Sequence, residues 1–205
     1  MDKRKKKQHN KKHIVSIARS HGVLRARDLA ALDIPPIATQ RLVREGTLVR
    51  EGRGLYSLRD YRATRHHTLA TVTKRLPNGV VCLLSALAFH QIGTQLPYQV
   101  WLALDRKAWT PQGLDLPVHV VRFSGAALTE GVESHRIEGV TVRVYSPAKT
   151  VADCFKYRNK VGLDVALEAL RESWRERRVT MDELSRFARI CRVARVMRPY
   201  LESLA

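Results

Sequence analysis

The segment that decides the fold of the first third of the chain covers residues 33–58 and reads Asp33-Ile34-Pro35-Pro36-Ile37-Ala38-Thr39-Gln40-Arg41-Leu42-Val43-Arg44-Glu45-Gly46-Thr47-Leu48-Val49-Arg50-Glu51-Gly52-Arg53-Gly54-Leu55-Tyr56-Ser57-Leu58. Its proline pair ends one helix, and the second proline suits the first turn of the next, where no intrahelical N–H is needed. The pattern predicts a helix over residues 36–45 that stops at a glycine. Two short apolar segments then flank a polar Gly-x-Gly turn, which predicts a β-hairpin.

Two further helices are predicted upstream of this segment. The first begins near residue 13, carries Ile14, Ile17 and Ala18 on one face, and ends at His21-Gly22. The second is brief and covers residues 27–32. Three helices followed by a hairpin predict a winged helix-turn-helix over residues 13–60.

The third predicted helix has the chemistry of a DNA-reading element. We expect Ile37, Leu42 and Val43 to face the core. The polar residues expected on the opposite face and on the hairpin tip are the predicted DNA-binding residues: Thr39, Gln40, Arg41, Arg44, Arg50 and Arg53. A helix fits the major groove, where Gln and Arg can bind adenine and guanine edges through two hydrogen bonds. The alternative is a small helical domain whose arginines only keep it in solution.

The net charge favours a nucleic-acid partner. The chain has 205 residues, with 37 Lys and Arg against 19 Asp and Glu, a formal net charge of +18. The first 62 residues carry +10 of this charge, so the positive density is highest there. Seven basic residues lie between Lys3 and Lys12 with no apolar residue among them. We expect residues 1–12 to form a disordered basic tail, which either lies on DNA phosphates, with Lys11 and Lys12 as additional contacts, or is simply solvated.

From residue 61 onward the pattern changes to an α+β domain that reaches residue 205. Apolar strands are expected at 100–104 and 118–123, and a hairpin at 134–145. Ser146-Pro147 predicts a helix start, and Thr180 with Glu183 has the spacing of a capping box. The fold class is therefore predicted as α+β, a winged helix-turn-helix followed by a mixed domain that ends in helices.

Sequence signatures of enzymes and metal sites are missing from the chain. There is no nucleophile elbow, P-loop or glycine-rich dinucleotide turn. Asp105 could serve as a catalytic acid but is favoured as a turn residue, and Asp153 as a helical partner of Lys149, Lys156 or Tyr157. The three cysteines lie far apart and are expected to be buried thiols in a reducing cytoplasm. We therefore predict no enzyme, cofactor or metal, and no membrane span or secretory signal.

Two sets of arginines remain near the C-terminus. Arg171, Arg175 and Arg178 lie at helical spacing on one face, and arginines recur every third residue from 186 to 198. They are either additional nucleic-acid or acidic-protein contacts or a solvated face.

Several segments of the chain resemble a known family. The stretch from residues 22–29 through residues 54–58 resembles the N-terminal winged helix of AbiEi-type antitoxins. Residues 85–93, Ser-Ala-Leu-Ala-Phe-His-Gln-Ile-Gly, and the Tyr145-Ser146-Pro147 junction within residues 142–155 are similar to the C-terminal domain of that family. The resemblance covers roughly residues 13–178.

The resemblance implies a bacterial or archaeal repressor that is also the antitoxin of a type IV toxin–antitoxin pair, a class linked to phage defence. Members bind inverted repeats upstream of their own operon, as monomers or as a dimer. Their C-terminal domain counters a co-encoded nucleotidyltransferase-like toxin, in the usual description without a stable complex. The resemblance carries the recognition-helix role over to Thr39, Gln40, Arg41 and Arg44, and the wing role to Arg50 and Arg53.

Three other functions remain open on the sequence. The chain could be a regulator whose second domain dimerises or senses a ligand and has no antitoxin role. It could be a nuclease delivered to DNA by the winged helix, with Asp105 as the acid to test. It could also bind RNA in place of duplex DNA.

Overall fold

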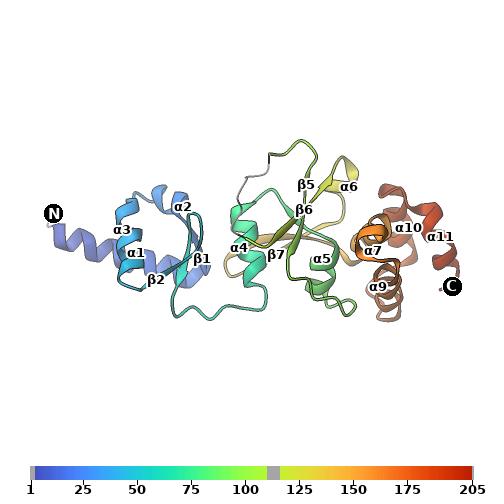
Figure 1. The fold of residues 1–205 in the computed structure, drawn as a ribbon, viewed down its shortest axis with the longest axis horizontal. Coiled ribbons are helices and arrows are strands. Elements are labelled where there is room, and N and C mark those ends of the chain that lie inside the picture. The colour runs from blue at the N-terminus through green and yellow to red at the C-terminus, as the bar shows by residue number, and fades with distance from the viewer. Residues whose placement is uncertain (1–2, 110–115, 205) are drawn as a thin grey trace. The chain divides into compact units, whose positions relative to one another are not determined.

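The computed structural model describes residues 3–109 and 116–204 and, by contact density, divides the chain into two compact units. Unit 1 comprises residues 1–77 together with 136–142, and unit 2 comprises residues 78–135 and 143–205. Helices and strands mix in both (Figure 1). The predicted α+β class is confirmed.

Unit 1 contains the predicted helices and hairpin. Its first elements are α1 (Lys3–His21), β1 (Val23–Arg25), α2 (Ala26–Ala30), α3 (Pro36–Arg44), β2 (Leu48–Gly52) and β3 (Leu55–Leu58), followed by α4 (His67–Arg75). The three strands form an antiparallel sheet in the order β1-β3-β2, with β2 and β3 joined as the hairpin. Ile14, Leu29 and Leu42 come from three different helices and meet in the core beside the sheet. The three helices and the hairpin thus follow in the order that the sequence predicted.

Helix α1 begins earlier than the sequence suggested. It starts at Lys3, so residues 3–12 are helical, which corrects the disordered tail expected over residues 1–12; residues 1 and 2 lie outside the described residues. A tail is expected from the sequence because no apolar residue lies between Met1 and Ile14, yet Lys, Arg and Gln are good helix formers. The ammonium group of Lys11 also lies 2.8 Å from the carboxylate of Glu45, at the end of α3. The basic segment is therefore an extension of α1 that runs beside α3.

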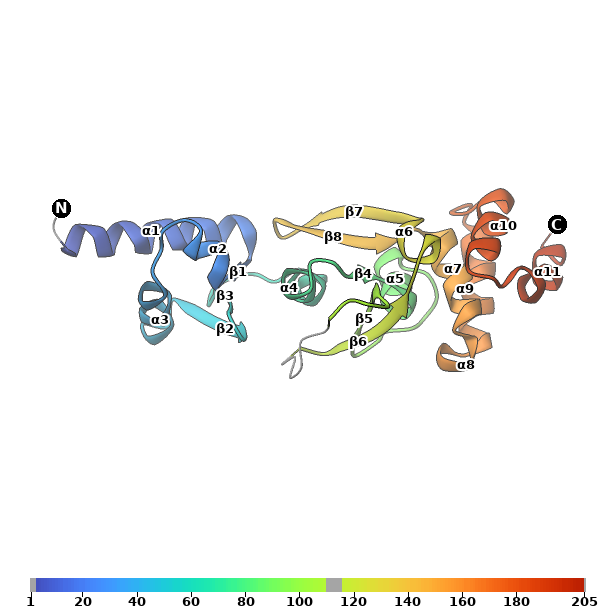
Figure 2. The ribbon, with the colours of Figure 1, turned by 90° about the horizontal axis from the view of Figure 1, so that it is seen from above.

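Unit 2 contains most of a five-stranded sheet and the C-terminal helices. The elements are β4 (Val80–Val81), α5 (Leu83–His90), β5 (Val100–Asp105), β6 (Val118–Phe123), α6 (Ala126–Thr129), β7 (Val132–Ile137), β8 (Val140–Tyr145), α7 (Pro147–Lys156), α8 (Arg158–Val161), α9 (Leu163–Arg175), α10 (Met181–Ile190) and α11 (Ala194–Glu202). The strand order is β6-β5-β4-β8-β7, with β5 parallel to β6 and β4 parallel to β8. Figure 2 shows α7 to α11 gathered beyond the end of β8.

Local signals set the ends of these helices as predicted. Pro147 follows Ser146, whose hydroxyl accepts a hydrogen bond from the Lys149 amide. The side chains of Thr180 and Glu183 each bond the other's backbone amide, which completes the capping box. Helix α7 lies in the core of unit 2, where Phe155, Val151 and Ala152 are fully buried.

The tip of the β7–β8 hairpin is held within unit 1 by Glu138. Its carboxylate side chain is only 1% exposed and lies 2.7 Å from His67 Nδ1. It accepts hydrogen bonds of 2.8 Å from both the amide and the hydroxyl of Thr64. Glu138 and Gly139 both have positive φ, as a two-residue hairpin turn requires. The hairpin is thereby tied to the segment that follows the wing.

This tie predicts acid sensitivity. Burial opposes ionisation of Glu138, but the bonds from Thr64 and His67 outweigh it and lower the pKa of Glu138 below the ordinary 4.5. A lowered pKa stabilises the fold above the unfolded pKa, and the contribution is lost as pH falls from about 4.5 through the folded value. We expect Glu138→Gln to lower the free energy of unfolding at pH 7 by about 1–3 kcal/mol, since Thr64 and His67 lose the charged acceptor of their hydrogen bonds. The loss should shrink toward pH 3 in denaturant titrations. A loss that is the same at both pH values would contradict this account.

Candidate nucleic-acid interface

Helix α3 presents one solvent-facing stripe. Pro35 precedes the helix in extended conformation and Pro36 occupies its first turn, as the sequence predicted. Ile37, Gln40, Arg41 and Arg44 follow at intervals of three and four residues, the spacing of one helical face. Gln40 and Arg44 are exposed, and their side chains make no ion pair or hydrogen bond within the described part of the chain. The face therefore offers an amide and two guanidinium groups beside an apolar side chain.

Two of the predicted orientations on α3 are wrong. Thr39 is 3% exposed and packs inward with Ala38 and Leu42, whereas Ile37 is 63% exposed. The helical period explains both orientations. Ala38 and Leu42, four residues apart, face the core, and Thr39 lies next to Ala38 on the same side of the helix. Thr39 therefore cannot contact a base from this position. An isoleucine is ordinarily expected in the core, so hydrophobicity alone does not predict that Ile37 is exposed. Its spacing of three and four residues from Gln40 and Arg41 is the sequence signal that places it on their face.

Arg41 is held by two contacts within unit 1. Its Nη2 donates to the carbonyl oxygen of Lys7 at 3.4 Å, and its Nε lies 3.6 Å from the carboxylate of Glu45. The hydrogen bond from Lys11 is the main reason that the pKa of Glu45 lies below its ordinary value. These contacts fix the position of the guanidinium at the boundary between α3 and the extension of α1.

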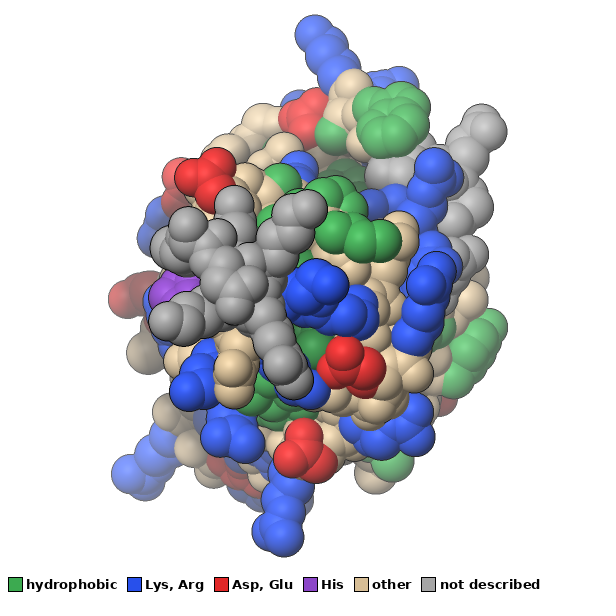
Figure 3. Space-filling model, turned by 90° about the vertical axis from the view of Figure 1, so that its left-hand side faces the viewer, with side chains coloured by type: hydrophobic (Ala, Val, Ile, Leu, Met, Phe, Trp, Pro, Cys, Tyr) green, Lys and Arg blue, Asp and Glu red, His purple; other side chains and the backbone are tan. Residues whose placement is uncertain are grey.

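A hollow lies between α3 and the α1 extension. Its volume is about 400 Å³, and its lining combines apolar and cationic side chains: Lys7, Asn10, Pro35, Ile37, Ala38, Arg41 and Arg44. Figure 3 views the molecule from its N-terminal side, and Lys and Arg side chains are spread across that face with few Asp and Glu among them. Such a surface attracts phosphates.

The hairpin tip places its arginines in solvent as predicted. Arg50 and Arg53 are both exposed, and the Nε of Arg50 donates to the Gly52 carbonyl at 3.2 Å. The strand pairing shifts between Arg50 and Gly52, and Gly54 has a φ of +73°, which favours glycine. Arg50 and Arg53 thus have the geometry of wing residues, and DNA contact by them stays a prediction.

The other basic residues predicted to contact nucleic acid differ in whether their side chains are already paired. Lys12, Arg171 and Arg175 are exposed, whereas Lys11 pairs with Glu45. Arg178 donates to the carbonyl of His90 and pairs with Glu176. Arg171, Arg175 and Arg178 belong to unit 2, and the α3 face belongs to unit 1.

The candidate acids and thiols of the sequence have definite surroundings in the described part of the chain. Asp105 accepts a bond from the Lys107 amide at 2.7 Å, as a turn residue does. Asp153 pairs with Lys149, one of its three predicted partners. The three cysteines are buried and reduced. Within residues 3–109 and 116–204 no cluster of three or more metal-ligating side chains forms, and no helix there is long and apolar enough to cross a bilayer.

Comparison with known proteins supports the interpretation of unit 1. Residues 14–59 match a family described as "Transcriptional regulator, AbiEi antitoxin". The crystal structure of the RV2827C protein from Mycobacterium tuberculosis is similar in fold, with a TM-score of 0.60 and 17% sequence identity, over 88% of this chain and 71% of that one. No curated protein matches the sequence. Residues 14–59, which carry the α3 face and the hairpin, thus match the AbiEi antitoxin family of transcriptional regulators, as the sequence resemblance predicted.

Proposed function

We propose that this protein is a sequence-specific DNA-binding repressor of its own operon and the antitoxin of a type IV toxin–antitoxin pair. The α3 face carries the DNA-binding part of this proposal, because a proline-started helix presents Gln40, Arg41 and Arg44 on one exposed side. Electrostatic capture by the +18 chain comes first, and α3 then reads base edges in the major groove. The operator is expected to contain inverted repeats, bound by two monomers or a dimer.

The antitoxin role rests on the family match and has its own test. The partner is a nucleotidyltransferase-like toxin encoded beside this gene. Co-expression of the full chain should restore growth of cells that express the neighbouring protein. The Gln40→Ala, Arg44→Ala variant, in which α3 no longer reads bases, should rescue equally well when expressed from a foreign promoter. Failure of the wild-type chain to rescue would leave a regulator without an antitoxin role.

A reporter fused to the upstream region tests autoregulation in cells. We expect the wild-type chain to lower reporter output, and the Gln40→Ala, Arg44→Ala variant to release it. Equal output with and without the wild-type chain would contradict the repressor role.

The α1 extension is expected to supply sequence-independent phosphate contacts. Deleting residues 1–12 should weaken binding to operator and random DNA alike. It should also flatten the dependence of log affinity on log salt by about 0.9 for each phosphate that the extension neutralises. Fluorescence anisotropy at three salt concentrations measures the slope. Lys7→Gln with Lys12→Gln keeps the helix length and should give a smaller decrease in slope. An unchanged slope after deletion would show that the extension does not touch DNA.

Ile37 is expected to read a thymine methyl group. An exposed isoleucine beside an apolar hollow on the reading face matches the one apolar group of the major groove, the C5-methyl of thymine. Replacing thymine by uracil in the operator removes only that methyl and should weaken wild-type binding severalfold at one position in each half-site. Ile37→Ala should bind both operators with the same reduced affinity. An undiminished thymine preference in Ile37→Ala would contradict the assignment. A wild-type chain that prefers the operator over random DNA but binds the thymine and uracil operators equally would overturn the role of Ile37 alone.

A further inference from the structure

A cavity of about 380 Å³ lies in unit 2, separate from the α3 face. It is lined by the end of β6, the start of α6, α7 with Tyr157, and the end of α10: Arg122, Phe123, Ser124, Gly125, Ala126, Ala127, Asp153, Lys156, Tyr157, Ile190, Cys191 and Arg192. The volume is within the range of small-molecule sites, roughly 300–1,000 Å³. β5 and β6 run parallel, and the cavity lies at the carboxyl end of β6, a frequent place for ligands in parallel sheets.

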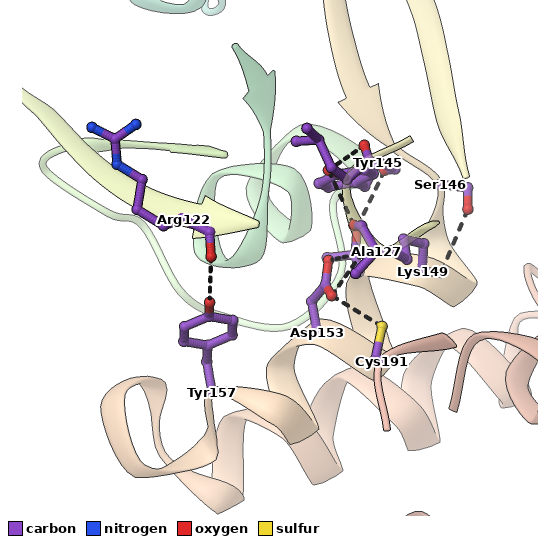
Figure 4. A network of polar contacts seen from close by, with 10 residues as sticks. Arg122, Ala127, Tyr145, Ser146, Lys149, Asp153, Tyr157 and Cys191 are labelled. Atoms are coloured by element: carbon purple, nitrogen blue, oxygen red, sulfur yellow. Dashed lines mark hydrogen bonds and ion pairs between the residues drawn. The ribbon is translucent and has the colours of Figure 1, made fainter. Parts of the chain in front are cut away.

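The wall of this cavity includes one member of a buried ion pair. Lys149 and Asp153 are 0% and 2% exposed, and the Lys149 ammonium donates to both carboxylate oxygens, at 2.7 and 2.6 Å. The thiol of Cys191 donates to Asp153 Oδ1 at 3.2 Å. Figure 4 shows Asp153 between Lys149 and Cys191. A fully buried ion pair is weak evidence for stability, because desolvation offsets the attraction. Its position beside a cavity favours a role in binding.

Aromatic rings enclose the pair and form one side of the cavity. The Lys149 ammonium lies 4.1 Å from the ring centre of Tyr145 and 4.8 Å from that of Phe123. Phe123 and Tyr157, which both line the cavity, are stacked with centroids 5.6 Å apart and planes 22° apart. The Tyr157 hydroxyl donates to the Arg122 carbonyl at 3.4 Å, which holds the ring in place. The cavity therefore has an aromatic wall and a hydrogen-bond acceptor, the Asp153 carboxylate.

Three exposed cationic residues line the cavity, of which Arg122 donates to the backbone carbonyls of Asp105 and Ala108. Lys156 and Arg192 are exposed, and neither forms an ion pair with a described residue. Lys149, Asp153 and Lys156 follow at intervals of four and three on α7, so they share one helical face. Arg192 has a φ of +59°, in the left-handed region that favours glycine. Arg192 therefore occupies, just after the end of α10, a backbone conformation that favours glycine.

We propose that this cavity binds a nucleoside monophosphate. The phosphate contacts Lys156 and Arg192, and the base lies against Phe123 and Tyr157. A carboxylate only accepts hydrogen bonds, so the base edge toward Asp153 carries a donor, which is an exocyclic amino group in adenine, cytosine or guanine and the N3–H in uracil. The cavity lies in unit 2, whereas the α3 face lies in unit 1.

Isothermal titration of the full chain tests this proposal, with AMP, CMP, GMP and UMP as ligands and inorganic phosphate and adenosine as part-ligands. We expect saturable binding of the four nucleotides, at least 10-fold tighter than that of adenosine or phosphate. Phosphate that binds as tightly as AMP would overturn the nucleotide assignment in favour of an adventitious ion only. Absence of saturable binding at millimolar nucleotide would overturn the site.

Arg192→Gly separates binding from folding. Glycine relieves the left-handed strain, so the thermal midpoint should stay the same or rise, while AMP affinity falls about 10-fold because the cation is removed. Lys156→Ala should give a similar loss of affinity. Arg195→Ala removes an equal charge from a residue outside the cavity lining and should leave binding unchanged. Equal affinities in all three variants would contradict the proposed phosphate contacts.

Discussion

Replacing Gln40 and Arg44 together by alanine is expected to remove most of the preference for operator over random DNA. Both side chains are exposed on the α3 face and are not engaged by described residues. Each contact through two hydrogen bonds to a base edge contributes about 1–3 kcal/mol of discrimination. If the two add, the preference should fall by at least about 30-fold, while binding to random DNA changes little.

Arg62→Ala is the matched control for this variant. Arg62 is exposed, lies outside α3 and the hairpin, and its loss changes the charge by the same amount. It should lower affinity for both DNAs slightly and leave the preference intact. Competition anisotropy with the upstream fragment and a scrambled duplex gives both quantities. An equal loss on both DNAs in the double variant would show that Gln40 and Arg44 contact phosphates.

Replacing Asp153 by alanine is expected to destabilise unit 2 by about 3–5 kcal/mol, because the Lys149 ammonium would stay buried without its carboxylate. Burial raises the pKa of Asp153, and the Lys149 charge opposes that rise, so each group depends on the other. Lys149→Met should also destabilise the fold by leaving the carboxylate unpaired.

The double variant is the informative control for the ion pair. Lys149→Met with Asp153→Leu fills a similar volume with apolar groups and should recover most of the stability lost in either single variant. Urea unfolding followed by circular dichroism measures all three. Single variants that each lose less than about 1 kcal/mol would contradict the buried, mutually dependent pair.

Features that depend on neighbouring residues could be predicted from the sequence. The Pro35-Pro36 start of α3, the Ser146-Pro147 start of α7 and the Thr180–Glu183 capping box follow from backbone chemistry within a few residues. The class of fold followed from these signals and from the strand pattern.

Features that depend on residues far apart in the chain could not be predicted from the sequence. Glu138 is 71 residues from His67 in the chain, and Lys7 is 34 from Arg41, so no spacing rule brings either pair together. Lys149 and Asp153 have the spacing of an ordinary surface pair, and only the packing of Tyr145 and Phe123 around them shows that they are buried. Hydrophobicity predicts Ile37 in the core, whereas the helical period places it on the exposed face.

The central claim is that this chain recognises the DNA upstream of its own gene through α3. Fluorescence anisotropy with that fragment and a scrambled duplex, at low and physiological salt, tests it most directly. The account predicts that absolute affinity falls with salt for both DNAs while the preference for the upstream fragment persists. Equal binding to both fragments, lost together as salt rises, would mean that the +18 charge acts alone and would contradict sequence-specific recognition.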